Sequence, residues 1–208
     1  MTAQLTCFGE SGNAYKAALT MQLSDYAWEA VPIDFFRGAG RSADFLALNE
    51  MGEVPVLVDG DVTLSQSCVI QLHVAERTGK LLAEDRAEML RWMFWDAHKG
   101  SSQQGTLRFQ MNFLPEEKRS AEVIAFLTGR VQAALATLDR HLEARDWITG
   151  DVPSLADTAC CGYLYYPEPF GFDAGSYPAI AAWLDRIAAL PGWRHPYDLM
   201  PRALPGAA

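Results

Sequence analysis

A turn of Asp59-Gly60 between two short apolar runs is the sequence feature that most limits the fold. The runs are 54–58, with sequence VPVLV, and 61–64, with sequence DVTL. Because Asp-Gly favours the tight turns that join paired strands, this segment predicts a β-hairpin whose register is well fixed. An all-helical chain is therefore excluded.

The residues before this hairpin predict two strands, each followed by a helix. Gln4–Phe8 has the composition of a short strand, and Ser11-Gly12-Asn13 then opens a helix with small and apolar residues on one face. Ala27–Ile33 is the second expected strand, and Ser42–Leu48 is a second, short helix. A strand, a helix and a further strand in this order predict a parallel βαβ unit.

The hairpin is followed by one more helix. Ser65 is expected to cap it, Thr78 to lie at its end, and Gly79 to occupy the position after its last turn. The first 79 residues therefore predict an α/β domain with the order β-α-β-α-β-β-α.

The rest of the chain predicts helices alone. Apolar residues recur at helical spacing from Met89 to His98 and from Val123 to Leu142. Ser154-Leu155-Ala156-Asp157 has the form of a capping box, and Pro178 begins a further amphipathic helix. We expect an all-α domain over residues 86–208.

Composition limits the classes of partner. The 208 residues are 50% hydrophobic and 21% charged, typical of a globular protein, and 17 Lys and Arg against 26 Asp and Glu give a net charge of −9. This charge disfavours binding to nucleic acid or to an anionic membrane. The four cysteines form no metal-ligand or disulfide pattern, so we expect no metal site and reduced thiols.

The most apolar segment, Thr158–Pro167, has about half the length that a bilayer-spanning helix needs. It predicts a buried helix. The N-terminus lacks the charged-then-apolar layout of a secretory signal, so a cytoplasmic protein is expected.

Three motifs accompany this order of elements: Val54-Pro55, Gln66-Ser67 followed by Ile70, and Ser154 to Asp157. Together with the element order they resemble the cytosolic glutathione S-transferase family over essentially the whole chain. The resemblance implies a thioredoxin-like first domain, a cis-proline at Pro55, and the tripeptide glutathione as co-substrate with no other cofactor.

Two of these motifs offer contacts to such a peptide. A cis bond before Pro55 would turn the N–H and C=O of Val54 outward, where a peptide backbone can pair with them; an ordinary trans proline at a strand start is the alternative. Gln66 and Ser67 begin a helix, whose N-terminus attracts a carboxylate, although plain capping by a serine is equally compatible.

The chemistry requires a thiolate, because the thiol itself is a poor nucleophile. Ser11, at the junction of the first strand and helix, could donate a hydrogen bond that stabilises the anion, and Asn13 offers a second donor. Phe8 at the strand end has no hydroxyl and Tyr15 lies inside the helix, so the tyrosine-type branches of the family are excluded. The remaining resemblance is to the serine- and asparagine-type bacterial branches. Simple capping by Ser11 is the alternative.

One position departs from the family pattern. Glu53, where a donor to the glycyl end of the peptide is frequent, would repel the glycyl carboxylate, and Arg37 or Arg41 could compensate.

The resemblance also implies an electrophile pocket between the domains and a two-fold homodimer. Candidate pocket residues are aromatic, basic or sulfur-containing and come from the helical domain: Trp92, Trp95, His98, Met111, Phe113 and Tyr166. Core packing is the alternative role for each.

Three functions follow from these observations. The first is a glutathione transferase acting on small hydrophobic electrophiles in detoxification. The second is a glutathione-dependent disulfide or peroxide reductase or isomerase on the same site. The third is a non-catalytic binding protein of the same fold. Residues 11–14, with sequence SGNA, exclude a C-x-x-C dithiol at this junction.

Overall fold

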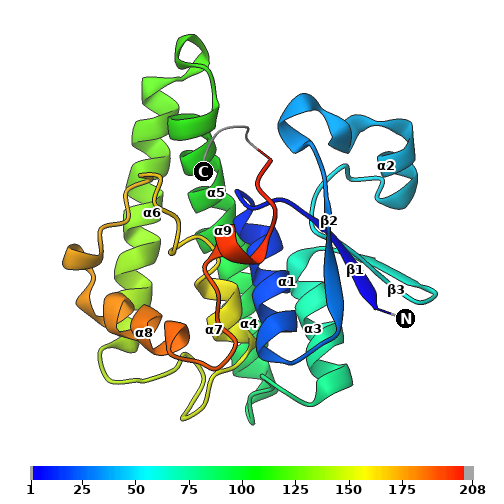
Figure 1. The fold of residues 1–208 in the computed structure, drawn as a ribbon. Coiled ribbons are helices and arrows are strands. Elements are labelled where there is room, and N and C mark those ends of the chain that lie inside the picture. Colours follow the sequence, from blue (N-terminus) through cyan, green and yellow to red (C-terminus); the bar gives the residue numbers. More distant parts are fainter. Residues whose placement is uncertain (1, 204–208) are drawn as a thin grey trace. The chain divides into compact units, whose positions relative to one another are not determined.

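The computed structural model describes residues 2–203 and divides into two compact units. The first comprises the described residues of Met1–Leu81 and of Pro191–Ala208, and the second is Leu82–Leu190. The expected helical domain extended to residue 208, whereas the chain after Leu190 packs within the first unit. Figure 1 shows this final segment, α9 (Pro196–Leu199), against the first helix.

The first unit has the predicted order β-α-β-α-β-β-α. Its elements are β1 (Ala3–Cys7), α1 (Gly12–Leu23), β2 (Trp28–Pro32), η1 (Phe35–Arg37), η2 (Ala39–Arg41), α2 (Ala43–Leu48), β3 (Val56–Asp59), β4 (Val62–Ser65) and α3 (Ser67–Thr78). The strands form one sheet in the order β2-β1-β3-β4. β1 runs parallel to β2, and the other two pairs are antiparallel. The predicted α/β fold is confirmed.

The strand register brings three chain segments to one edge of this sheet. Thr6 in β1 pairs with Val56 in β3, and Val56 pairs with Ser65 in β4. The end of β1, the start of β3 and the end of β4 therefore lie side by side. The residues that follow β1 and β4, and those that precede β3, all emerge at this edge.

The predicted hairpin is present at the opposite edge. Asp59 pairs with Val62, so Gly60 and Asp61 form the turn, and Gly60 has a φ of 64°, which glycine adopts without strain. The Asp59 carboxylate accepts hydrogen bonds from the Tyr26 hydroxyl at 2.6 Å and from His73 Nε2 at 2.9 Å. These bonds tie the hairpin to α3 and to the segment before β2.

The helix after the hairpin begins differently from the prediction. Ser65 is the last residue of β4 and does not cap α3. The N-cap residue of α3 is Gln66, with φ 70° and ψ 119°, and its side chain makes no capping hydrogen bond. A strand conformation at Ser65 is incompatible with its role as a cap. At the other end, Gly79 adopts the left-handed conformation with a φ of 69°, as predicted.

The core of the first unit lies between the sheet and two helices. α1 and α3 pack against each other, and α9 packs against α1 (Figure 1). Leu5 and Leu57 from the sheet and Ile70 from α3 are fully buried. Their apolar side chains supply the main stabilisation of this unit.

The second unit is helical, as predicted. Its elements are α4 (Arg86–Trp95), η3 (Asp96–Ser101), α5 (Ser102–Arg108), η4 (Phe109–Phe113), η5 (Glu116–Lys118), α6 (Ala121–Leu142), α7 (Leu155–Cys160), η6 (Ala174–Ser176) and α8 (Pro178–Ala188). Both η3 and η4 are π-helical turns. α4 packs against α7, and α6 packs against α5 and α8.

The π-helical turn η3 is held by a buried carboxylate. Ser101 Oγ donates to both carboxylate oxygens of Asp96, at 3.0 and 2.9 Å, and both residues are buried. A Cβ on Gly100 would lie 2.5 Å from Asp96 Oδ1. Glycine is therefore required for the close approach of this turn to the carboxylate.

α6 carries the predicted apolar stripe over most of its length. Val131, Leu135, Leu138 and Leu142 are buried, whereas Val123 is 42% exposed. By length and composition alone α6 could cross a membrane, a test that core helices of globular proteins also pass. Its buried stripe packs on α5 and α8.

The predicted capping box is present at α7. Ser154 Oγ accepts from the Ala156 N–H at 3.2 Å, and Asp157 Oδ2 accepts from the Ser154 N–H at 2.8 Å. Asp157 Oδ1 also accepts from Trp183 Nε1 in α8 at 2.9 Å. The expected helix over Thr158–Pro167 is wrong in extent, because α7 ends at Cys160 and turns follow.

Candidate active site

Ser11 stands where β1 ends and α1 begins. Its N–H donates to the Phe8 carbonyl at 3.1 Å, which closes the connecting turn, and its Oγ accepts from the Ala14 N–H at 3.1 Å as the N-cap of α1. A serine hydroxyl has one proton to donate besides its acceptor sites. No acceptor for that proton is found within residues 2–203, so it is available to a ligand.

Asn13 is the second residue of α1 and is half-buried. Its amide has no hydrogen-bond partner in the described part of the chain. The first N–H groups of a helix also lack intrahelical acceptors. The start of α1 therefore offers several donors, and no acidic residue lies in its first turn.

The peptide bond between Val54 and Pro55 is cis, as the family resemblance implied. Val54 lies just before β3, outside the paired strand. Neither its N–H nor its C=O has a partner among residues 2–203. A donor and an acceptor on one residue can pair with an extended peptide, as in strand addition.

Gln66 and Ser67 form the N-terminal end of α3. The φ of 70° at Gln66 is rare for a residue other than glycine, and such strain is concentrated at functional sites. Ser67 is 9% exposed, and its hydroxyl has no hydrogen-bond partner within the described residues. This helix end therefore offers a donor and a positive dipole to an anion.

Glu53 and Gln66 are in contact. Gln66 Nε2 donates to Glu53 Oε2 at 3.3 Å, and the Asn49 side chain donates to the Glu53 carbonyl at 2.8 Å. Arg41 donates weakly to the Met51 carbonyl at 3.5 Å and is exposed, while Arg37 pairs with Asp34 at 3.6 Å. The Glu53 carboxylate thus lies just before β3, and the guanidinium groups of Arg37 and Arg41 lie in η1 and η2 of the same unit.

These groups converge on one edge of the sheet. Ser11 follows β1, Val54 precedes β3 and Ser67 follows β4, and the pairing of Thr6 with Val56 and of Val56 with Ser65 aligns those strand ends. The edge therefore presents a hydroxyl donor, a backbone donor and acceptor, and a helix N-terminus. This set can bind a short anionic peptide and stabilise a thiolate on it.

Other nucleophilic or acidic groups near this edge are not available for such chemistry. Burial raises the pKa of the Cys7 thiol to about 12. Tyr15 is fully buried and donates its hydroxyl to the Arg194 carbonyl at 2.9 Å. Phe8 stacks on Phe35 with ring centroids 4.8 Å apart. Ser11 and Asn13 are thus the side-chain donors left at this turn.

The predicted electrophile-pocket residues all lie in the second unit and differ in exposure. Trp92 and Tyr166 are buried, Trp95, Met111 and Phe113 are half-buried, and His98 is exposed. Five of the six fall into two groups, and His98 belongs to neither. Trp92 packs on Trp95 with centroids 5.0 Å apart and donates Nε1 to Glu88, at 2.9 Å.

The second group surrounds a buried arginine. The guanidinium of Arg108 lies 3.9 Å from the ring centre of Tyr166 and 4.8 Å from that of Phe113, and it donates to Glu168 Oε2 at 2.6 Å. Tyr166 and Phe113 therefore share one cation. Met111 lies with Phe113 in the π-helical turn η4.

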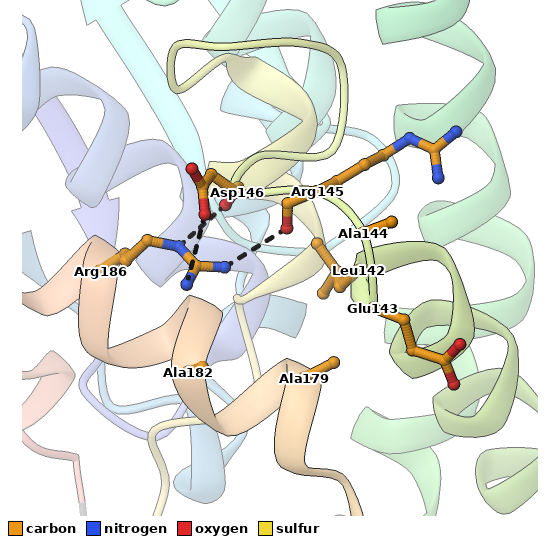
Figure 2. A pocket seen from close by; sticks show the side chains of 8 residues that line it. All are labelled: Leu142, Glu143, Ala144, Arg145, Asp146, Ala179, Ala182 and Arg186. Atoms are coloured by element: carbon orange, nitrogen blue, oxygen red, sulfur yellow. Dashed lines mark hydrogen bonds and ion pairs between the residues drawn. The ribbon is translucent and has the colours of Figure 1, made fainter.

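Of two hollows in the second unit, one is lined by a predicted pocket residue and the other is not. One, of about 310 Å³, has Trp95 in its wall together with Lys99, Gln103 and Arg130. Another, of about 290 Å³, lies between the end of α6 and α8 and contains none of the predicted residues. Figure 2 shows Arg186 on one side of the latter, bonded to the Asp146 and Arg145 carbonyls at 3.1 and 3.4 Å.

Within residues 2–203, no group of three or more His, Cys, Asp or Glu is arranged to hold a metal ion.

One participant at the Ser11 turn was missed by sequence reasoning. Glu10, directly before Ser11, has a buried carboxylate that is bonded to Arg202 from the far end of the chain. The two residues are 192 positions apart, so no local pattern could have indicated the contact.

Comparison with known proteins agrees with this geometry. Residues 3–76 match the family described as glutathione S-transferase, N-terminal domain, and residues 106–191 match glutathione S-transferase, C-terminal domain. A crystal structure of a possible glutathione S-transferase from Rhodopseudomonas palustris has a TM-score of 0.86 and 32% identity, over 94% of this chain and 98% of that one.

Two curated relatives extend the comparison. The disulfide-bond oxidoreductase YfcG of Escherichia coli is 25% identical, with 88% of this chain and 89% of that protein covered. Glutathione S-transferase 3 of Zea mays is 28% identical, with 92% of this chain and 91% of that protein covered. With both domain families matched in order and a relative at 32% identity over nearly its full length, the chain belongs to the glutathione S-transferase family.

Proposed function

We propose that this chain is a serine-type glutathione transferase of the kind found in bacterial branches of the family, with Ser11 as the residue that activates the thiol. The observation that carries the proposal is the Ser11 hydroxyl, which caps α1 through its oxygen and keeps its proton for another acceptor. Asn13 is the second donor. Both belong to the edge of the sheet where Val54 and Ser67 offer contacts to a peptide.

The reaction begins with loss of the proton from the glutathione thiol to solvent. A free thiol is only a few per cent ionised at neutral pH, so the site has to lower its pKa. A hydrogen bond from a neutral donor to an anion is worth about 1.5–3 kcal/mol, and one pKa unit corresponds to about 1.4 kcal/mol. The Ser11 hydroxyl and the N-terminus of α1 together can therefore lower the pKa of the glutathione thiol by about one to two units.

The thiolate sulfur then attacks the electrophilic carbon of the second substrate. A carbon–sulfur bond forms. In a substitution, the bond to the departing group breaks and its electron pair leaves with that group, such as a halide. In an addition, the π bond of an activated double bond breaks, its electron pair moves toward the electron-withdrawing group, and a proton is taken up from water. No metal and no further cofactor takes part. Ser11 keeps its proton throughout and acts by stabilising the anion.

Binding of glutathione uses the other groups of the edge. The N–H and C=O of Val54 pair with the cysteinyl backbone, and the γ-glutamyl α-carboxylate binds at Gln66 and Ser67, where the helix dipole and the Ser67 hydroxyl favour an anion. Arg41 offsets the repulsion between Glu53 and the glycyl carboxylate. Arg41 donates to the Met51 carbonyl at 3.5 Å, two residues before Glu53, and this proximity supports the assignment.

Small hydrophobic electrophiles fit the residues available in the second unit. The candidates are the aromatic and sulfur side chains of α4, η4 and the segment after α7, together with His98: Trp92, Trp95, His98, Met111, Phe113 and Tyr166. Trp95 already lines a hollow. Conjugation of such compounds is a detoxification reaction. The cytoplasm is the proposed location, because the four cysteines are reduced thiols, as is usual in a reducing compartment.

A homodimer is the proposed assembly. Several large apolar side chains of the second unit remain exposed, among them Phe94 at 66% and Phe126 at 64%. Exposed aromatic residues on helices are typical of interfaces. Light scattering of the purified protein tests this assembly, and a mass near the 23.0 kDa of a single chain would contradict it.

A reductase is the second candidate, favoured by the similarity to the oxidoreductase YfcG. Residues 11–14, SGNA, carry no cysteine, so such a reaction would consume two glutathione molecules per disulfide and release glutathione disulfide. An isomerase on the same site is a variant of this candidate. A non-catalytic binding protein is the third, and the exposed Glu53 beside the peptide site is the feature that favours it.

One panel of assays distinguishes these functions. The protein is incubated with glutathione and, separately, an aryl halide, a hydroperoxide and a mixed disulfide, and calorimetry measures glutathione binding. Turnover of the aryl halide is the expected result. Activity with the disulfide or the hydroperoxide alone would favour the reductase, and absence of binding would favour the non-catalytic protein.

A further inference from the structure

The C-terminal segment of the first unit lies across the turn that presents Ser11. The Gly9 N–H donates to the Pro201 carbonyl at 2.7 Å. A Cβ on Gly9 would lie 3.2 Å from Arg202 Cγ and 3.2 Å from Tyr197 Cδ1. The backbone of the turn and the segment at 197–202 are therefore in direct contact, and even a methyl group at Gly9 would be tight against that segment.

Glu10 is the centre of this contact. Its side chain is fully buried, and it accepts a hydrogen bond from Arg202 Nε to Oε1 at 3.1 Å and from the Ala203 N–H to Oε2 at 3.0 Å. Each carboxylate oxygen is thus held by a different donor of the same segment. A buried carboxylate held at both oxygens has little freedom to rotate or shift.

Arg202 is itself fixed from a second side. Its guanidinium lies 3.9 Å from the ring centre of Tyr197, a cation–π distance, and its side chain is 24% exposed. The backbone nearby is anchored on α1, because Tyr15 donates its hydroxyl to the Arg194 carbonyl at 2.9 Å. α1 therefore helps to position the segment from which Arg202 reaches Glu10.

We propose that Arg202, acting through Glu10, is a positioning residue that holds the Ser11 hydroxyl against the glutathione sulfur. This inference rests on the proposed role of Ser11. Glu10 is covalently adjacent to Ser11, so the bonds at its carboxylate and the bond at Gly9 restrain the backbone from which the hydroxyl projects. The position of the catalytic donor therefore depends on residues 201–203 as well as on the β1–α1 turn.

The chemistry explains why such restraint is useful. Hydrogen bonds weaken steeply with distance and angle, and a displacement of about 1 Å in a catalytic group can cost a large factor in rate. The N-cap bond to Ala14 fixes only the oxygen of Ser11. The hydroxyl proton itself rotates freely toward an acceptor, so its distance from a bound thiolate depends on where the backbone places the Ser11 side chain, and Glu10 and Gly9 restrain that backbone.

Substitution of Arg202 tests the inference on the full-length protein. The variants are Arg202→Ala, Arg202→Gln, Arg202→Lys and Ser11→Ala, with Lys80→Ala as the matched control. Lys80 forms an exposed ion pair with Asp25 at 2.5 Å in the same unit, away from the Ser11 turn. For each protein, the pKa of bound glutathione is measured from thiolate absorbance at saturating glutathione, together with KM for glutathione and the melting temperature.

We expect Arg202→Ala to raise the thiolate pKa by about one unit. KM for glutathione should change by less than about twofold, because Val54 and Ser67 are untouched. Arg202→Lys keeps the cation, so its thiol pKa should lie between the value in the parent protein and the value in Arg202→Ala. Lys80→Ala should leave the pKa unchanged even if it lowers the melting temperature.

Two outcomes would overturn the inference and can be told apart. If Ser11→Ala raises the pKa and Arg202→Ala does not, Ser11 activates the thiol but Arg202 has only a structural role. If neither variant moves the pKa, Ser11 is not the activating group, and the positioning role falls together with the proposed mechanism. Should Arg202→Ala fail to fold, Arg202→Gln decides, because it removes the cation and keeps part of the side chain; an unchanged pKa in that variant alongside a raised pKa in Ser11→Ala contradicts the positioning role.

Discussion

The Oγ of Ser11 accepts a hydrogen bond from the Ala14 N–H at 3.1 Å, so one hydroxyl caps α1 and still has a proton to donate. The two roles use different parts of the same group. Capping uses a lone pair on the oxygen, and activation of a thiolate uses the O–H. They can therefore be separated by experiment.

The capping role predicts a loss of stability. Replacing an N-cap serine with alanine costs about 0.5–2 kcal/mol, so we expect Ser11→Ala to lower the free energy of unfolding by roughly 1 kcal/mol in urea titrations. Ser120→Ala is the matched control, since Ser120 caps α6 by accepting from the Val123 N–H at 3.3 Å. It should lose similar stability and keep full activity. A Ser11→Ala protein as stable as the parent would show that the cap contributes nothing.

The anchoring role of Ser67 predicts a separate effect. Ser67→Ala removes a buried hydroxyl from the N-terminal end of α3, which is the proposed carboxylate site. A hydrogen bond to a charged group is worth about 1.5–3 kcal/mol, so the dissociation constant of glutathione should rise by about tenfold or more. Calorimetry measures it. The thiolate pKa should change little.

A control lies two residues earlier. Ser65→Ala alters a strand residue of β4 that is not at the helix end, and it should leave affinity unchanged. Equal affinities for Ser67→Ala and Ser65→Ala would place the carboxylate elsewhere.

The fold contains its own acid-sensitive contact at the hairpin. Hydrogen bonds from His73 and then from Tyr26 hold the pKa of Asp59 below its usual range. A carboxyl group whose pKa is depressed on folding contributes stability above its unfolded pKa, and that stability is lost as pH falls through the folded value. We expect the free energy of unfolding to decline below about pH 4, because the pKa of an aspartate in an unfolded chain is near that value.

Asp59→Asn tests this dependence. The variant should be less stable than the parent at neutral pH, and the difference should shrink as the pH falls through the acid range, which denaturant titrations at several pH values would reveal. Asp61→Asn, in the adjacent turn, is the control for a general loss of charge. Parallel pH profiles for Asp59→Asn and the parent would contradict the account.

Local signals in the sequence were sufficient for most of the first unit. The Asp59-Gly60 turn fixed the hairpin, the Ser11 cap fixed the start of α1, and Gly79 fixed the end of α3, because each depends on the conformational preferences of one or two residues. The capping box at Ser154 and Asp157 was equally visible, since both of its hydrogen bonds are formed within four residues. Features with a short-range cause were predicted correctly.

Features with a long-range cause were not. Ser65 has the composition of a cap, but strand pairing with Val56 extends through it, and Gln66 is forced to a φ of 70° by the join between strand and helix. The bond between Glu10 and Arg202 depends on the return of the chain after Leu190 to the first unit. The π-helical turn at Asp96–Ser101 depends on a buried carboxylate that hydrophobic periodicity does not reveal. Tertiary contacts decided all three.

The thiolate pKa of bound glutathione in Ser11→Ala tests the central claim most directly. The assignment of Ser11 as the thiol-activating donor predicts a rise of up to about two pKa units relative to the parent protein, with glutathione affinity nearly unchanged. Ser120→Ala, which loses a comparable cap, should show the parent value. A Ser11→Ala protein whose bound thiol titrates at the parent pKa would contradict the claim and leave Asn13 or a backbone N–H of α1 as the activating group.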